Sequence, residues 1–244
     1  MTAAPFHPVN RVARAITDAV ARRGPAVPRR RDEYSARLAE PWHVRTLIVP
    51  MPGEGAVELL FANLISGRVG VAGFDDEPPA DPSVAPRDES HLALLVLGRG
   101  AAIAETLAFS RREHVRATEG GLRVEVPGSF TYEVRGRWPD YTQSIRVPSR
   151  ELDVELRVRC APPVRWWAYA PRAYVHHSAF GAAAGSVALA GTRTVVDHPA
   201  SLEPASGQNL LRLPRAPSLP ATLFHYQLGT LPGVASWAIG CPSG

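Results

Sequence analysis

The chain has 244 residues, of which 45% are hydrophobic and 20% charged, and this composition excludes an intrinsically disordered protein. Its 24 prolines and 20 glycines argue against a helical bundle and favour short elements joined by turns. The net charge of +4 is confined to the N-terminal part, because residues 1–37 hold eight Arg against three acidic residues. The remainder is close to neutral, which argues against a nucleic-acid-binding body.

The first predicted element is a basic N-terminal helix. Its apolar residues recur at helical spacing between Val9 and Val20, and Gly24-Pro25 ends the pattern. We expect residues 1–40 to form this helix and a linker, which either packs on the body, frays, or binds a membrane surface or a partner. Residues 41–244 then form the β domain, with a second sub-domain beginning near residue 200 as an alternative.

From Trp42 onward the hydrophobic period changes from 3.6 to 2, which predicts strands. The predicted strands, in chain order, are 44–49, 57–65, 92–97, 101–109, 122–126, 130–134, 144–147, 152–160, 174–180, 185–190, 193–196, 223–228 and 234–239. Residues 75–88 and 199–221 are rich in proline and polar residues, and we expect them to be loops. Gly191-Thr192 is expected to form a hairpin turn.

The clearest of these strands is the segment 152–160. Leu152, Val154, Leu156, Val158 and Cys160 alternate with charged residues, so one face is buried and the other is wet. Many short strands without helices between them predict a mainly β, antiparallel protein with a lipocalin-like (calycin-type) barrel, followed by at most part of a second barrel. Such barrels enclose one small ligand.

The cysteines and the apolar runs carry little chemistry. Cys160 and Cys241 are too few for a disulfide framework or a metal cluster. No apolar run reaches the length of a membrane span, and the N-terminus lacks the apolar region of a signal peptide. A cytoplasmic location without stable membrane insertion is therefore the expectation.

One segment offers a cofactor site. The apolar run from Leu94 leads into Gly98-Arg99-Gly100, as at a dinucleotide phosphate loop, but Ile103 replaces the third glycine. The two interpretations are an NAD(P)-dependent reductase and a simple hairpin turn. The hairpin is favoured because the βαβ unit expected after such a loop is missing: residues 122–134 show the alternation of a β-hairpin instead.

Candidate acid–base residues lie in two places. Glu105 shares a predicted strand face with Ile103, Leu107 and Phe109, where an apolar environment would favour a neutral carboxyl; an ion pair with Arg is the alternative. The second place is a polar and aromatic group of ten residues, composed of Trp166, Trp167, Tyr169, Tyr174, His176, His177, Ser178, Asp197, His198 and Glu203. Tyr174, His176 and Ser178 would share one face of a strand. His176, His198 and Glu203 match no standard metal motif, so no metal is expected.

Several short motifs together resemble bacterial relatives of the carotenoid hydratase (hydroxyneurosporene synthase) and AttH-like superfamily. The motifs are Pro50-Met51-Pro52, Phe74-Asp75-Asp76, Pro86-Arg87-Asp88, Trp166-Trp167, Tyr174-Val175-His176-His177-Ser178, Gly185-Ser186-Val187 with Gly191, and Ser201-Leu202-Glu203. The resemblance implies lipocalin-like barrels and places Tyr174, His176 and Glu203 at the pocket. The chain departs from the pattern at Asp197-His198-Pro199, where a glycine-rich stretch is expected.

The leading hypothesis is therefore a protein that binds a small hydrophobic, isoprenoid- or polyketide-like molecule. As an enzyme it would carry out hydration, isomerisation or cyclisation without a cofactor, with Glu203 or Glu105 as the acid and His176 and Tyr174 positioning it. Trp166, Trp167, His177, Phe180 and His198 would line the ligand site. A non-catalytic carrier and an NAD(P)-dependent reductase are the alternatives.

Overall fold

The computed structural model describes Ala19 and residues 24–29, 43–50, 57–66, 89–98, 101–170, 174–207, 223–228 and 235–240. The elements are β1 (His43–Pro50), β2 (Val57–Ser66), β3 (Glu89–Gly98), β4 (Ala101–Ser110), α2 (Arg111–His114), β5 (Val115–Thr118), β6 (Gly121–Val126), β7 (Phe130–Arg137), β8 (Asp140–Val147), η1 (Pro148–Arg150), β9 (Leu152–Ala170), β10 (Tyr174–Leu189), β11 (Thr192–Gly207), β12 (Leu223–Leu228) and β13 (Ala235–Gly240). Every strand pairing is antiparallel, which confirms the predicted mainly β, antiparallel fold.

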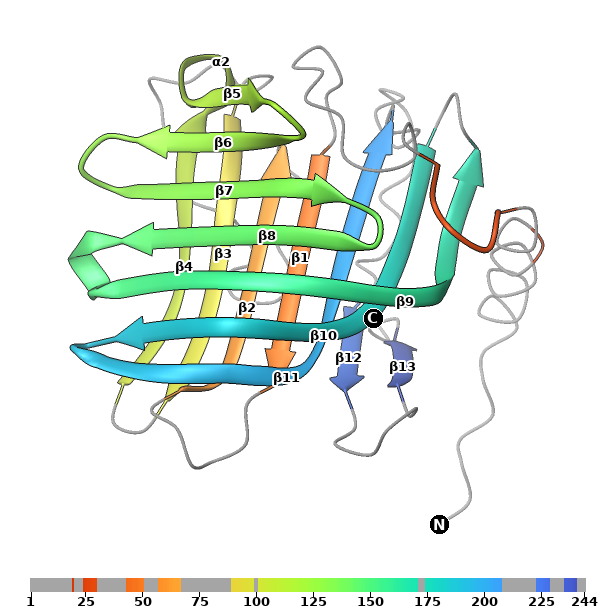
Figure 1. Ribbon diagram of the computed structural model, residues 1–244. Helices are drawn as coiled ribbons and strands as arrows, with labels where there is room; N and C mark the ends of the chain where they lie inside the picture. Colours follow the sequence, from red (N-terminus) through yellow and green to blue (C-terminus); the bar gives the residue numbers. More distant parts are fainter. Residues whose placement is uncertain are drawn as a thin grey trace.

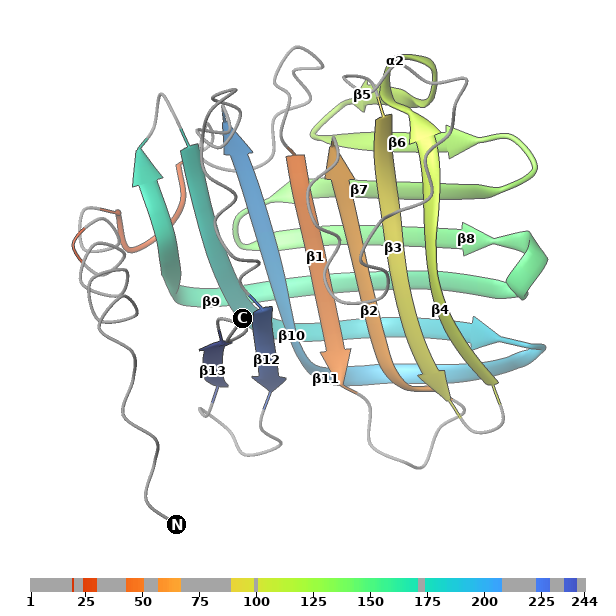
Figure 2. The same cartoon turned by 180° about the vertical axis from the view of Figure 1, so that it is seen from behind.

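Eleven strands form one sheet, in the order β4-β3-β2-β1-β11-β10-β9-β8-β7-β6-β5. The sheet folds over into two layers whose strands cross, as Figures 1 and 2 show from opposite sides. The three central strands, β9, β10 and β11, are 19, 16 and 16 residues long, so each contributes to both layers. Within the described residues, the edge strands β4 and β5 are joined by α2 but are not paired with each other, so the sheet is not a closed barrel.

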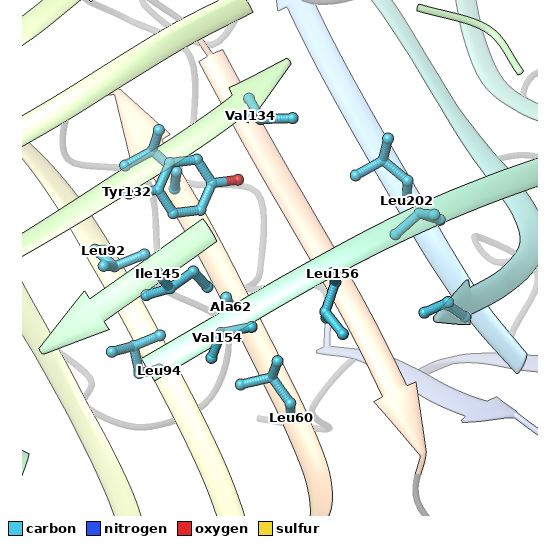
Figure 3. Close-up of a cluster of buried hydrophobic side chains, with 14 of the residues drawn as sticks. Leu60, Ala62, Leu92, Leu94, Tyr132, Val134, Ile145, Val154, Leu156 and Leu202 are labelled. Atoms are coloured by element: carbon cyan, nitrogen blue, oxygen red, sulfur yellow. The ribbon is translucent and has the colours of Figure 1, made fainter. Parts of the chain in front are cut away.

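The space between the two layers holds a continuous apolar cluster. Figure 3 shows Leu60, Leu94 and Leu202 of one layer facing Tyr132 and Ile145 of the other. All five side chains are at most 2% exposed and belong to one cluster of buried residues. We define the sheet face that lines this space as the inner face and the opposite one as the outer face.

The predicted alternation of residues 152–160 is confirmed. Leu152, Val154, Leu156, Val158 and Cys160 are all at most 5% exposed, whereas the charged residues between them lie mostly in solvent. Cross-strand charge pairing is present too, because the Arg146 guanidinium binds the Asp153 carboxylate at 3.0 Å.

Several predicted bounds were wrong. The predicted strands 174–180 and 185–190 are one continuous strand, β10. Residues 199–207 belong to β11, although proline and serine had suggested a loop. β5 was missed, because its four residues, Val115–Thr118, are too few to show an alternation. The hairpin turn is Ala190-Gly191, one residue earlier than predicted, and both residues have positive φ, as a type I′ turn requires.

The glycine-rich segment after β3 is part of a β-hairpin. Gly98 pairs with Ala101, and β3 and β4 are antiparallel neighbours along their whole length. A dinucleotide phosphate loop needs a helix and a parallel strand after the first strand, so the interpretation of Gly98-Arg99-Gly100 as such a loop is wrong.

The predicted N-terminal helix lies almost entirely outside the described residues, as do the predicted loop 75–88 and the part of the loop 199–221 after Gly207. The division into residues 1–40 and 41–244 stays a prediction. Among the helices that the structure describes, none has the length and apolar character needed to span a bilayer.

Candidate functional site

Glu203 is a buried acid on the outer face of the sheet. Its neighbour Leu202 lies between the layers (Figure 3), so strand alternation turns Glu203 to the opposite face. Only 2% of Glu203 is exposed. A carboxyl group is costly to remove from water, so its burial on a face that does not form the core points to a function.

Three buried polar side chains lie in one row across the strands that surround Glu203. Glu203 pairs with Thr46 of β1, and Thr46 pairs with Asn63 of β2. On the other side, the constant register between β10 and β11 places Ser178 opposite Glu203. Directly opposite residues share a face, so Ser178, Glu203 and Asn63 lie on the outer face, and they are 0%, 2% and 6% exposed. We call these three residues the polar row.

An apolar row lies beside the polar row on the same face. Phe180 pairs with Ser201, and Ile48 joins Ser201 to Phe61, which pairs with Leu95. The row is apolar except for Ser201, which is fully buried. Phe61 is buried and Phe180 and Leu95 are partly buried. A row of polar groups beside a row of large apolar side chains is typical of sites for small molecules that are mainly hydrophobic.

The predicted residues Tyr174 and His176 occupy the same face as Glu203. His176 pairs with Ala205, and Tyr174 pairs with Gly207. Ala205 and Gly207 are two and four residues after Glu203 on β11, so all three positions belong to the same face of that strand. The predicted sharing of one face by Tyr174, His176 and Ser178 therefore agrees with the backbone register. The structure describes the backbone, but not the side chains, at Tyr174 and His176 and at Trp167.

Trp166 and His177 form a second cluster on the inner face. They pair directly across β9 and β10, and their ring centroids are 4.7 Å apart. Tyr169 packs edge-on against Trp166 at 4.6 Å. His177 is fully buried and Trp166 is 3% exposed. The structure brings these two predicted ligand residues together, but on the face of the sheet opposite to Glu203.

Glu105 is separated from both clusters. It lies on the edge strand β4, where its carboxylate accepts hydrogen bonds from Arg150 Nε at 3.1 Å and Nη2 at 2.8 Å. This hydrogen bond, followed by the charge of Glu105, raises the pKa of Arg150 above its ordinary value. The ion pair is the alternative that the sequence left open, and it gives Glu105 a structural role at the edge of the two layers.

His198 is also distant from Glu203. It pairs with Ala183 and precedes Glu203 by five residues of extended chain, which is about 16 Å. The set His176, His198 and Glu203 therefore does not converge. In the part of the chain that the structure describes, no group of three or more His, Cys, Asp or Glu is placed to hold a metal ion.

Sequence reasoning missed two buried polar residues of the outer face. Asn63 interrupts the apolar strand β2, and His91, fully buried, lies next to it on β3, where it pairs with Ile65. A single amide inside an apolar run was the available signal. Its significance depends on the pairing of β1 with β11, which no local pattern reveals.

Comparison with known proteins supports the fold and nothing finer. No protein-family model and no curated protein matches the chain. Among solved structures, a candidate AttH protein from Nitrosomonas europaea is similar, with a TM-score of 0.50 and 11% sequence identity. The match covers 78% of this chain and 58% of that protein, so the chain corresponds to little more than half of its structural neighbour. The fold is AttH-like, as the sequence motifs implied.

Proposed function

We propose that the outer face of β10, β11, β1 and β2 binds a small, mainly hydrophobic molecule, isoprenoid- or polyketide-like, that carries one polar group. The observation that carries this proposal is the burial of Glu203 in the polar row beside Phe61 and Phe180. The polar row would bind the polar group and the apolar row the hydrocarbon part. The AttH-like fold supports the proposal, since the resemblance that predicted it implies proteins that act on such molecules.

The outer face replaces the barrel interior as the site. The space between the layers is occupied by Leu60, Leu94, Tyr132 and their neighbours, all fully buried (Figure 3). A guest there would have to displace close-packed side chains. On the outer face the buried groups include the Glu203 carboxyl, and no other carboxyl is as buried among the residues that the structure describes.

The chemistry that this site could perform is acid catalysis without a cofactor. Glu203 would donate a proton to an alkene carbon of the ligand, and water or a neighbouring group would add to the cation that forms. The Glu203 carboxylate would then take back a proton from the cation or from the added water. No proton is gained or lost over the whole reaction, whether it is a hydration, an isomerisation or a cyclisation. His176 and Tyr174, on the same face, would move this proton or orient the carboxyl.

Two carboxylates of the chain provide a matched test. We expect Glu203→Gln to weaken the binding of retinol, a fluorescent isoprenoid alcohol, by about tenfold, since one good polar contact contributes roughly 1.4 kcal/mol. Glu105→Gln, at the ion pair with Arg150, should leave retinol affinity unchanged. Equal affinities in the wild type and both variants would contradict the proposed site.

A second measurement separates an enzyme from a carrier. Native mass spectrometry of the protein purified from its source would identify a retained apolar molecule. This molecule is then incubated with ligand-free protein in D2O. Deuterium incorporation by the wild type and not by Glu203→Gln supports acid catalysis. A molecule that binds and is never altered supports the carrier function.

A further inference from the structure

The segment Gly24–Arg29 lies against the end of β9, beyond the point where β9 loses its partner β8. The β8–β9 pairing ends at Arg159, opposite Asp140. From there to Ala170, no described strand pairs with this edge of β9. The segment, drawn in red in Figure 1, lies beside this edge. An open strand edge offers unpaired backbone groups to any extended chain that can reach it.

Two backbone carbonyls hold the segment on this edge. The Val164 N–H donates to the Ala26 carbonyl at 3.1 Å, which adds one main-chain bond to the sheet. The Trp166 indole N–H donates to the Pro25 carbonyl at 2.6 Å. Pro28 is buried, whereas Val27 is 39% exposed. The segment is therefore recognised through its backbone and its prolines.

Gly24 makes the closest contact of the segment. A Cβ atom at this position would overlap the Cδ1, Cγ and Nε1 atoms of the Trp166 ring. Only glycine lets the backbone lie directly on the indole. The other contacts of Trp166, with Tyr169 and His177, come from the sheet itself, so the segment completes the burial of a preformed aromatic cluster.

This combination has the chemistry of a peptide-recognition groove. Extended proline-containing segments bind to other proteins by packing on aromatic rings and by accepting hydrogen bonds from indole N–H groups. Strand addition supplies a main-chain bond at an exposed sheet edge. The segment Gly24–Pro28 bends at Gly24, Ala26 and Val27, its two prolines restrict its backbone, and it supplies one carbonyl acceptor for the indole and one for the sheet edge.

We propose that the edge of β9 from Val164 to Trp166 is a binding groove for a Gly-Pro-x-x-Pro segment, and that the chain fills it reversibly with its own residues 24–28. Between the described residues of the segment and β9, two hydrogen bonds and one glycine–indole contact are made, whereas each strand pair of the sheet is joined along its length. Release exposes Trp166 and His177 and frees the groove for the same segment of another molecule. The groove is on the inner face, so it is independent of the function proposed for Glu203.

The first test uses the full-length protein with Gly24→Ala. Because the new methyl group overlaps the indole, we expect amide hydrogen exchange to rise at least tenfold at Val164, whose N–H donates to the Ala26 carbonyl. Val27→Ala, which shortens a side chain that points partly to solvent, is the matched control and should exchange as the wild type does. Should Gly24→Ala fail to fold, Trp166→Phe removes the indole donor, keeps a ring and is expected to show the same increase.

The second test asks whether the groove binds the segment when it is supplied separately. A fluorescein-labelled peptide of residues 22–30 is titrated onto full-length Gly24→Ala protein and followed by anisotropy. We expect saturable binding, at least tenfold weaker binding of the peptide carrying Gly24→Ala, and weaker binding to protein that also carries Trp166→Phe. Exchange at the wild-type rate in Gly24→Ala, or equal binding of both peptides, would overturn the proposal.

Discussion

The two faces of the sheet bury polar groups in different ways. On the inner face, the buried amide of Gln143 donates to the Tyr132 hydroxyl at 2.9 Å, and the buried His177 lies far from this pair against the Trp166 ring. On the outer face, Ser178, Glu203 and Asn63 lie in one row, with His91 nearby. Separate buried polar groups can serve to fix a unique packing, whereas a row of them gains little for stability. The difference agrees with an inner face that mainly forms the core and with the ligand site that we propose on the outer face.

The largest effect should come from the inner face. Tyr132 is fully buried, so Tyr132→Ala is expected to lower the free energy of unfolding by about 3–5 kcal/mol, measured by urea denaturation. Tyr132→Phe keeps the ring and removes the hydroxyl that accepts from Gln143, so its cost should be about 1–2 kcal/mol. Equal losses for the two variants would mean that the space between the layers is not close-packed, and a guest site there would regain support.

The two buried amides allow a direct comparison of the faces. Gln143→Leu leaves the Tyr132 hydroxyl without its donor and should cost about 1–3 kcal/mol of stability, with unchanged retinol affinity. Asn63→Leu should cost no more than this and should weaken retinol binding about tenfold, as expected for the loss of one polar contact. Urea denaturation and fluorescence titration measure the two quantities. If both variants bind retinol equally well, Asn63 is only a structural residue.

The inner face was predictable from the sequence, because its signal is local. The alternation of Leu152, Val154, Leu156 and Val158 with charged residues defines a strand and its buried side without any knowledge of its partners. The type of the fold follows from many such strands. The failures were at ends of strands, as at Pro199, which lies within β11 although proline usually marks a loop.

The outer face was predictable only in part, because its signal depends on register. Tyr174, His176 and Ser178 could be placed on one face from β10 alone. Their relation to Glu203 depends on the β10–β11 register, and the relation of Asn63 to Glu203 depends on β1 lying between them. At Glu105 the local signal was misleading, because its apolar strand suggested an acid–base site. Arg150, 45 residues later in the chain, forms an ion pair with it, and no local pattern reveals this contact.

The smallest effects should come from the tip of the β10–β11 hairpin, which belongs to the layer of β5–β9 and is far along both strands from the polar row. Ala190 has φ 49° and Gly191 has φ 77°, a conformation that suits Asn-Gly better than Ala-Gly. Ala190→Asn should therefore raise the free energy of unfolding by about 0.5–1 kcal/mol, and Gly191→Ala should lower it by about 1 kcal/mol. Both changes should leave retinol affinity at the wild-type value, because the strain is local to the turn. A change in affinity caused by either variant would show that the two ends of β10 are coupled, and the separation between a folding face and a binding face would then fail.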